Sequence, residues 1–137
     1  MSLETQVQNL ASETTRRLKT LRGGKDEDIR AAARDLMAKL AFGAWLLAGN
    51  LLRAAVGNRV QRQTLSIRRF QSRLTEADDA HLLALLDHAV AAVLWHLIVA
   101  RRDGVGLRRI EHLVAEFIDT AEDDLAKLNH VVKGVRP

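Results

Sequence analysis

Apolar residues recur at every third or fourth position along most of this chain, and this spacing limits its fold more than any other feature. The clearest stretch covers residues 76–102. Its apolar face would contain Leu82, Leu86, Ala89, Val93, Leu97 and Ala100. No segment alternates apolar and polar residues over a useful length, as a half-buried strand would. One proline and 4% aromatic residues also argue against a β-sandwich or barrel. We therefore predict an all-α protein.

The breaks in this periodicity predict a bundle of four to five helices in a single domain that covers residues 1–137. The expected helices are an N-terminal amphipathic helix over residues 1–22, a central helix over Glu27–Ala55, a shorter one over Arg59–Arg73, a long one over Glu76–Arg102, and a last one from Leu107 through Leu128. Thr75 is the expected N-cap of the fourth helix, with Asp78 reaching back in a capping box. Residues 129–137 are expected to form a flexible tail. Trp45 and Trp95 lie within apolar runs and are expected core residues.

Several classes of function are disfavoured by the residues that the chain lacks. Without cysteine there is no disulfide, zinc thiolate or cysteine nucleophile. The chain also has no Glu-x-x-His, no His-Glu-x-x-His and no phosphate-binding loop. We therefore expect no enzymatic activity, no catalytic residues, no metal and no cofactor. A metal or haem site using His81, His88, His96 or His112 is the least favoured hypothesis, because partly buried histidines with one hydrogen bond are commoner.

The chain contains no uncharged run that is long enough to span a membrane. The longest uncharged runs, Leu40–Leu52 and His88–Ala100, contain 13 residues each, against the ~20 that a spanning helix needs. We expect both runs to be the buried middles of soluble helices. No basic and apolar leader pattern is visible at the N-terminus, so we expect a cytoplasmic protein that makes no membrane contact.

Arginines are concentrated in one part of the sequence. Residues 36–75 carry a net charge of +7 with no Asp or Glu, whereas residues 76–137 carry −4. The arginines of this tract are Arg53, Arg59, Arg62, Arg68, Arg69 and Arg73. A guanidinium group can hold two phosphate oxygens at once, whatever the base. We therefore predict that these six residues contact the backbone of DNA or RNA.

An opposing interpretation is that the chain neutralises its own arginine tract. Asp119, Glu122, Asp123 and Asp124 lie in the second half of the last helix, where acids oppose the helix dipole and need compensation. The arginines could supply it within one chain or between copies. Both interpretations stay open at the level of sequence. Phe70 is the only aromatic residue in the tract, so base stacking is not the expected mode of binding.

In its size, helical architecture, basic face and lack of catalytic motifs, the whole chain resembles the small helical-bundle subunits of CRISPR effector complexes. That resemblance implies a non-enzymatic subunit, present in several copies, that helps hold a guide–target duplex or a displaced strand in antiviral defence. The implied contacts would be Arg53, Arg59, Arg62, Arg69 and Arg73, and the acidic last helix would face a neighbouring subunit.

A second hypothesis is a helical scaffold or adaptor that acts through contacts with other proteins or with copies of itself. It rests on the apolar stripe from Leu3 to Leu21, which could dock a partner helix.

Overall fold

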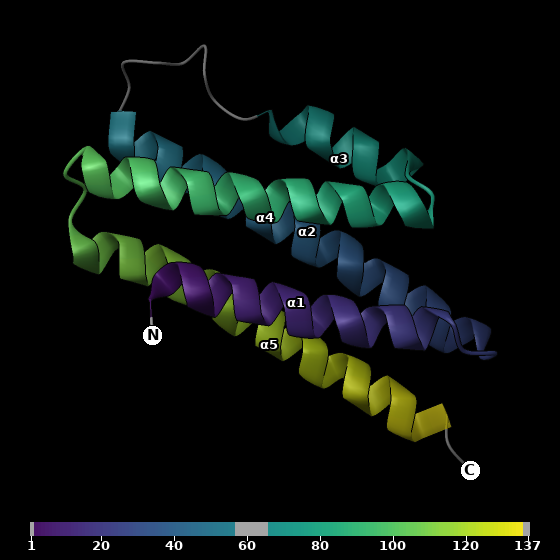
Figure 1. Cartoon of the computed structure of the whole chain (residues 1–137). Coiled ribbons are helices and arrows are strands. Elements are labelled where there is room, and N and C mark those ends of the chain that lie inside the picture. Colours follow the sequence, from purple (N-terminus) through teal and green to yellow (C-terminus); the bar gives the residue numbers. More distant parts are fainter. Residues whose placement is uncertain (1, 57–65, 136–137) are drawn as a thin grey trace.

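The computed structural model describes residues 2–56 and 66–135, and in this part of the chain it contains five helices and no strand (Figure 1). The helices are α1 (Leu3–Arg22), α2 (Glu27–Val56), α3 (Ile67–Glu76), α4 (Asp79–Arg102) and α5 (Leu107–Val135). The predicted all-α, single-domain bundle is confirmed.

Helix α2 lies at the centre of the bundle and packs against each of the other four helices (Figure 1). Small residues on its surface, among them Ala41, Ala44 and Ala48, are fully buried and allow close packing of the neighbouring helices. The predicted inner face of α4, from Leu82 to Ala100, is buried along its whole length. Helices α2 and α4 are packed as their apolar spacing predicts, because burying the apolar face of each removes it from water.

Helix α1 completes the core rather than presenting its apolar stripe to a partner. Val7, Thr14 and Leu18 are buried, and Leu3, Leu10 and Leu21 pack against the buried cluster. The stripe faces α2, α4 and α5. The sequence pattern was correct, but its interpretation as a surface for a partner is wrong, because the fold itself covers it.

The start of α4 differs from the prediction. Thr75 lies inside α3, where its hydroxyl donates to the Gln71 carbonyl oxygen at 3.0 Å. The N-cap is Asp78, whose Oδ1 accepts the His81 backbone N–H at 2.9 Å. Ala77, in an extended conformation, follows the end of α3. Helix α3 therefore ends at Glu76, three residues beyond Arg73, where it was expected to end. Residues 59–65, which were expected to begin this helix, lie outside the described part of the chain.

Two further expectations fail. Residues 129–135 are helical, whereas a flexible tail was predicted for 129–137, and residues 136 and 137 lie outside the described part of the chain. Buried Leu128 anchors the end of α5, and no proline occurs before Pro137 to stop it. Trp95 is 59% exposed and is not a core residue, because it lies on the outer face of α4.

Two helices are long and apolar enough to cross a membrane by length and composition. In α2, half of the apolar window is buried, because this helix lies at the centre of the bundle. In α4, only 28% of the corresponding apolar window is buried. The expectation that the run His88–Ala100 is the buried middle of a helix is therefore correct for the inner face alone. Its outer face carries exposed Trp95 and Ile98.

Candidate nucleic-acid interface

Helix α3 carries three of the four described arginines of the tract and is held on α2 by Trp45. The indole ring stacks on Phe70, with ring centroids 4.5 Å apart and planes 5° from parallel. Its Nε1 donates to the Ser66 carbonyl oxygen at 3.2 Å, directly before α3 begins. His88 of α4 packs against the same indole at 5.4 Å. One tryptophan thus joins α2, α3 and α4.

The local sequence of α3 separates its anchoring residues from its charged ones. Phe70 and Leu74, four residues apart, are buried on one face. Successive side chains project about 100° apart around a helix, so residues 68, 69 and 73 fall off that face. Arg68, Arg69 and Arg73 are all exposed. Ser66 caps the helix by accepting the Arg69 backbone N–H at 3.2 Å.

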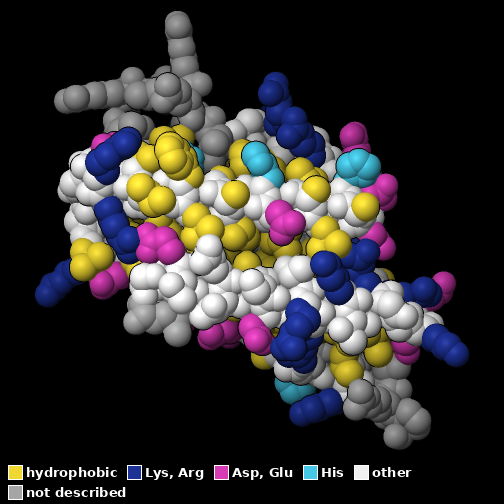
Figure 2. Space-filling model, in the orientation of Figure 1, with side chains coloured by type: hydrophobic (Ala, Val, Ile, Leu, Met, Phe, Trp, Pro, Cys, Tyr) yellow, Lys and Arg dark blue, Asp and Glu magenta, His cyan; other side chains and the backbone are white. Residues whose placement is uncertain are grey.

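The three arginines of α3 occupy two sides of the helix. Arg69 and Arg73 share one side, and Arg73 lines a shallow hollow together with His81, Ala84 and His88 of α4. Arg68 lies about 100° around the helix from Arg69. Figure 2 shows basic side chains above α4, next to apolar and histidine side chains.

The other predicted site residues are less closely grouped. Arg53 is exposed near the end of α2, eight residues beyond Trp45, and its guanidinium donates to Asn50 Oδ1. This spacing places it about 12 Å further along α2. Arg59 and Arg62 lie outside the described residues. Of the predicted ridge formed by residues 59, 62, 69 and 73, the structure therefore describes only the last two.

Within the described residues, no arginine of α3 forms an ion pair, whereas several arginines elsewhere do. Arg22 and Arg34 pair with Asp79, at 3.2 and 2.7 Å, and Arg101 pairs with Glu4. The acidic cluster from Asp119 to Asp124 lies on α5, which packs against α1, α2 and α4, whereas α3 packs on α2. Neutralisation of Arg68, Arg69 and Arg73 within one chain is therefore not found here, and neutralisation between copies stays an open interpretation.

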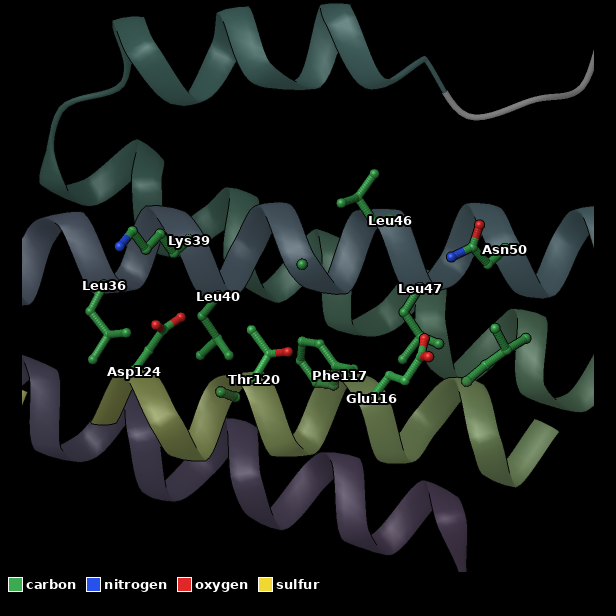
Figure 3. A pocket seen from close by; sticks show the side chains of 13 residues that line it. Leu36, Lys39, Leu40, Leu46, Leu47, Asn50, Glu116, Phe117, Thr120 and Asp124 are labelled. Carbon is green, nitrogen blue, oxygen red and sulfur yellow. The ribbon is translucent and has the colours of Figure 1, made fainter. Parts of the chain in front are cut away.

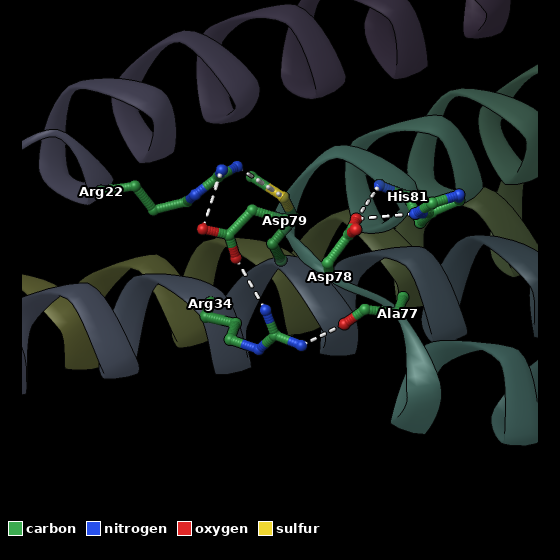
Figure 4. Close-up of polar contacts among 7 residues, drawn as sticks. Arg22, Arg34, Ala77, Asp78, Asp79 and His81 are labelled. Carbon is green, nitrogen blue, oxygen red and sulfur yellow. Dashed lines mark hydrogen bonds and ion pairs between the residues drawn. The ribbon is translucent and has the colours of Figure 1, made fainter.

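The polar network around Asp79 fixes the connection between α3 and α4 (Figure 4). Arg34 of α2 donates to Asp79 Oδ1 and also to the Ala77 carbonyl oxygen. Arg22, at the end of α1, reaches the other carboxylate oxygen. This network could not be predicted from the sequence, because Asp79 lies more than 40 residues from both Arg22 and Arg34 and no local pattern links them. Its effect is to hold the end of α3 in place.

The described histidines are dispersed. His81 lies 2.7 Å from the Asp78 carboxylate, and His112 lies 3.1 Å from that of Glu116. Hydrogen bonds from the His81 backbone and side chain lower the pKa of Asp78. His96 is half-buried, its Nδ1 has no partner among the described residues, and burial lowers its pKa. Within the described ranges, no three His, Asp or Glu side chains converge as a metal site would require.

A cavity of about 230 Å³ lies between α2 and α5 (Figure 3). Its floor is apolar and includes Leu40, Leu47 and Phe117. Lys39 and Asp124 lie at its edge, so the rim carries both signs of charge. Glu116 and Thr120 of α5 also line it. The packing of α5 against Gly43 accounts for its shape, since the Phe117 ring lies in ordinary contact there.

Comparisons with protein-family models, with curated proteins and with solved structures find no match to this chain. A functional interpretation therefore rests on the chemistry of its own residues. The exposed arginines of α3 are the strongest feature of this kind.

Proposed function

We propose that this chain is a non-enzymatic subunit of a nucleoprotein assembly and binds nucleic-acid backbones through α3 and its surroundings. The observation that carries this proposal is that Arg68, Arg69 and Arg73 are exposed and have no carboxylate partner among the described residues. An exposed guanidinium group that is not engaged in an ion pair is free to bind phosphate in bidentate fashion.

The acids closest in sequence to these arginines support the same conclusion. Glu76, the one carboxylate on α3, is its last residue and lines the same hollow as Arg73, but no ion pair joins the two among the described residues. Asp78 is engaged as the N-cap of α4, and Asp79 is engaged by Arg22 and Arg34. The positive charge of α3 is therefore not cancelled by the chain that follows it.

Rigid anchoring supports a binding role as well. Phe70, Leu74 and the hydrogen bond from Trp45 hold α3 in one orientation, so the arginines of α3 are presented by a helix that is already ordered. Less backbone entropy is then lost on binding than if a disordered basic segment had to fold. Because phosphates carry no base identity, we expect affinity without sequence preference.

Salt dependence tests the proposal directly. Each neutralised phosphate contributes about −0.9 to the slope of log K against log salt on duplex DNA, so four described arginines predict a slope of about −3.6, or about −5 if Arg59 and Arg62 take part. The triple variant R68Q/R69Q/R73Q should make the slope shallower by about 2.7, because three phosphate contacts are lost. Fluorescence anisotropy with labelled single strands and duplexes, from 50 to 300 mM KCl, measures this slope.

A matched control is available on α1. R16Q/R17Q/K19Q removes the same charge from exposed positions of another helix and should change the slope by less than about 1. Equal losses in the two triple variants would show that only the net charge matters. No binding at 50 mM KCl would contradict the proposal outright.

A scaffold role through protein contacts is the second candidate function. The stripe from Leu3 to Leu21 no longer supports it, since the core covers those residues. The observation that now favours protein contact is the exposed apolar face of α4.

A further inference from the structure

Helix α4 presents a second regular face to solvent, opposite the one that it buries in the core. The side chains of this outer face are spaced by four and three residues in alternation, and all of them are exposed: Ala84, His88, Ala91, Trp95, Ile98 and Arg102. The ring of His88 also packs against Trp45 of α2. Trp95 and Ile98 are more than half exposed, at 59% and 51%. Figure 2 shows apolar side chains along α4 on this side of the molecule. Large exposed apolar side chains in a regular row are typical of a surface that another helix covers.

The outer face of α4 is self-complementary in size. Its N-terminal half contains the small residues Ala84 and Ala91, and its C-terminal half contains the large residues Trp95 and Ile98. In an antiparallel pair of α4 helices with a two-fold axis at Ala91, Ile98 lies opposite Ala84, and Trp95 lies at the level of Asp87, next to His88. Ala91 faces its own equivalent and allows close approach. In a parallel pair, by contrast, Trp95 would meet Trp95.

Charge along the same helix is self-complementary in the same direction. Asp78 lies at the start of α4 and Arg102 in its last turn, whereas Asp79 and Arg101 are paired within the chain, with Arg22, Arg34 and Glu4. Arg102 is exposed, and among the described residues its one ion-pair contact is a long one to Asp103, at 3.9 Å. Antiparallel pairing brings Arg102 next to His81 and Asp78 of a second copy and sets opposite helix dipoles side by side. Parallel pairing would put like charges together.

We propose that two copies of this chain pair antiparallel through the outer face of α4, with the two-fold axis near Ala91. A membrane is a poorer match, because the stripe from Ala84 to Ile98 spans only about 21 Å of helix, against a hydrocarbon core of about 30 Å. The stripe is also interrupted by His88. The pairing does not use the arginines of α3, although Ala84 and His88 of the paired face also line the hollow beside Arg73.

The first test is the mass of the protein in solution. Light scattering and sedimentation equilibrium should give twice the chain mass of 15.2 kDa at micromolar concentration. The variant W95D/I98D should shift the protein to the chain mass, with an unchanged circular dichroism spectrum, because both side chains are exposed in one copy. L107D replaces an equally exposed leucine outside the stripe and should remain dimeric.

The second test uses the absence of cysteine from the chain. A single A91C substitution places two thiols at the two-fold axis, within the roughly 4.4–6.8 Å between Cα atoms that a disulfide requires, so mild oxidation should give a covalent dimer. A84C lies seven residues from the axis, so its two thiols would be about 21 Å apart and should not cross-link. This test keeps the wild-type residues Trp95 and Ile98.

Three outcomes would overturn the proposal. The wild-type protein could have the mass of one chain at every concentration. If this monomer also sedimented with lipid vesicles, the outer face of α4 would be assigned to a membrane. A91C and A84C could cross-link equally, which would indicate parallel pairing. L107D could dissociate the dimer while W95D/I98D did not, which would place the interface elsewhere.

Discussion

Replacing Asp79 with asparagine tests whether the contacts made by this carboxylate hold α1, α2 and the start of α4 together. Its two oxygens accept from Arg22 and Arg34, and Arg34 also binds the Ala77 carbonyl oxygen (Figure 4). Asparagine keeps the size of the side chain and removes its charge. The variant therefore perturbs the network without opening a cavity.

The cost follows from how exposed each partner is. The Arg22 side chain is 16% exposed, and its Nε already lacks a partner among the described residues, so losing its carboxylate should cost about 1.5 kcal/mol. In the second ion pair, the Arg34 side chain is 40% exposed and that of Asp79 is 53% exposed, which limits the contribution of this pair to stability to about 0.5 kcal/mol. The lost acid in the first turn of α4 adds about 0.5 kcal/mol. Together these contributions predict a loss of about 2.5 kcal/mol, equivalent to roughly 8 °C in Tm for a domain of this size.

Urea unfolding followed by circular dichroism measures the free energy of unfolding for both proteins. The matched control is Asp28→Asn, which removes an exposed acid from the first turn of α2 and should cost about 0.5 kcal/mol through the helix dipole alone. If D79N lost no more stability than D28N, the network would not hold the helices together and the reasoning would be refuted.

Two further predictions concern backbone conformation and pH. G49A should stabilise the protein by about 0.5–1 kcal/mol, because nothing lies within 4 Å of the added methyl group in α2, whereas G104A should destabilise it by about 1 kcal/mol because its φ is +81°; thermal melts of both variants measure this contrast. Burial lowers the pKa of His96, so its contribution to stability is full above pH 6.5 and is lost as the pH falls through the lowered value. H96L should therefore flatten the stability profile from pH 7.5 to 5, with H130L as the exposed control, and an unchanged profile would contradict this prediction.

The sequence predicted the helices and their inner faces because these depend on local spacing. Leu82, Leu86 and Leu97 recur at helical intervals, and a helix with such a stripe has to bury it. The N-cap of α4 was predicted wrongly for an equally local reason. Thr75 and Asp78 both have side chains that can cap a helix, and only the structure shows that α3 continues past Thr75 and that α4 begins after Asp78.

Local patterns could not distinguish the two tryptophans. Each lies in the middle of an apolar run, but Trp45 is packed between α3 and α4 while Trp95 faces solvent. Their burial depends on which neighbouring helix covers which side of α2 and α4, and that choice involves residues far away in sequence.

The sequence alone determined that the chain forms an all-α bundle, which sides of its helices are apolar, and that its positive charge is concentrated around residues 53–73. Only the tertiary structure decided how these features are used: the stripe of α1 enters the core, the outer face of α4 stays uncovered, and Asp79 engages Arg22 and Arg34 rather than the arginines of α3. The physical reason is that periodicity depends on neighbours within one or two turns, whereas burial and ion pairing depend on contacts between helices that are distant along the chain.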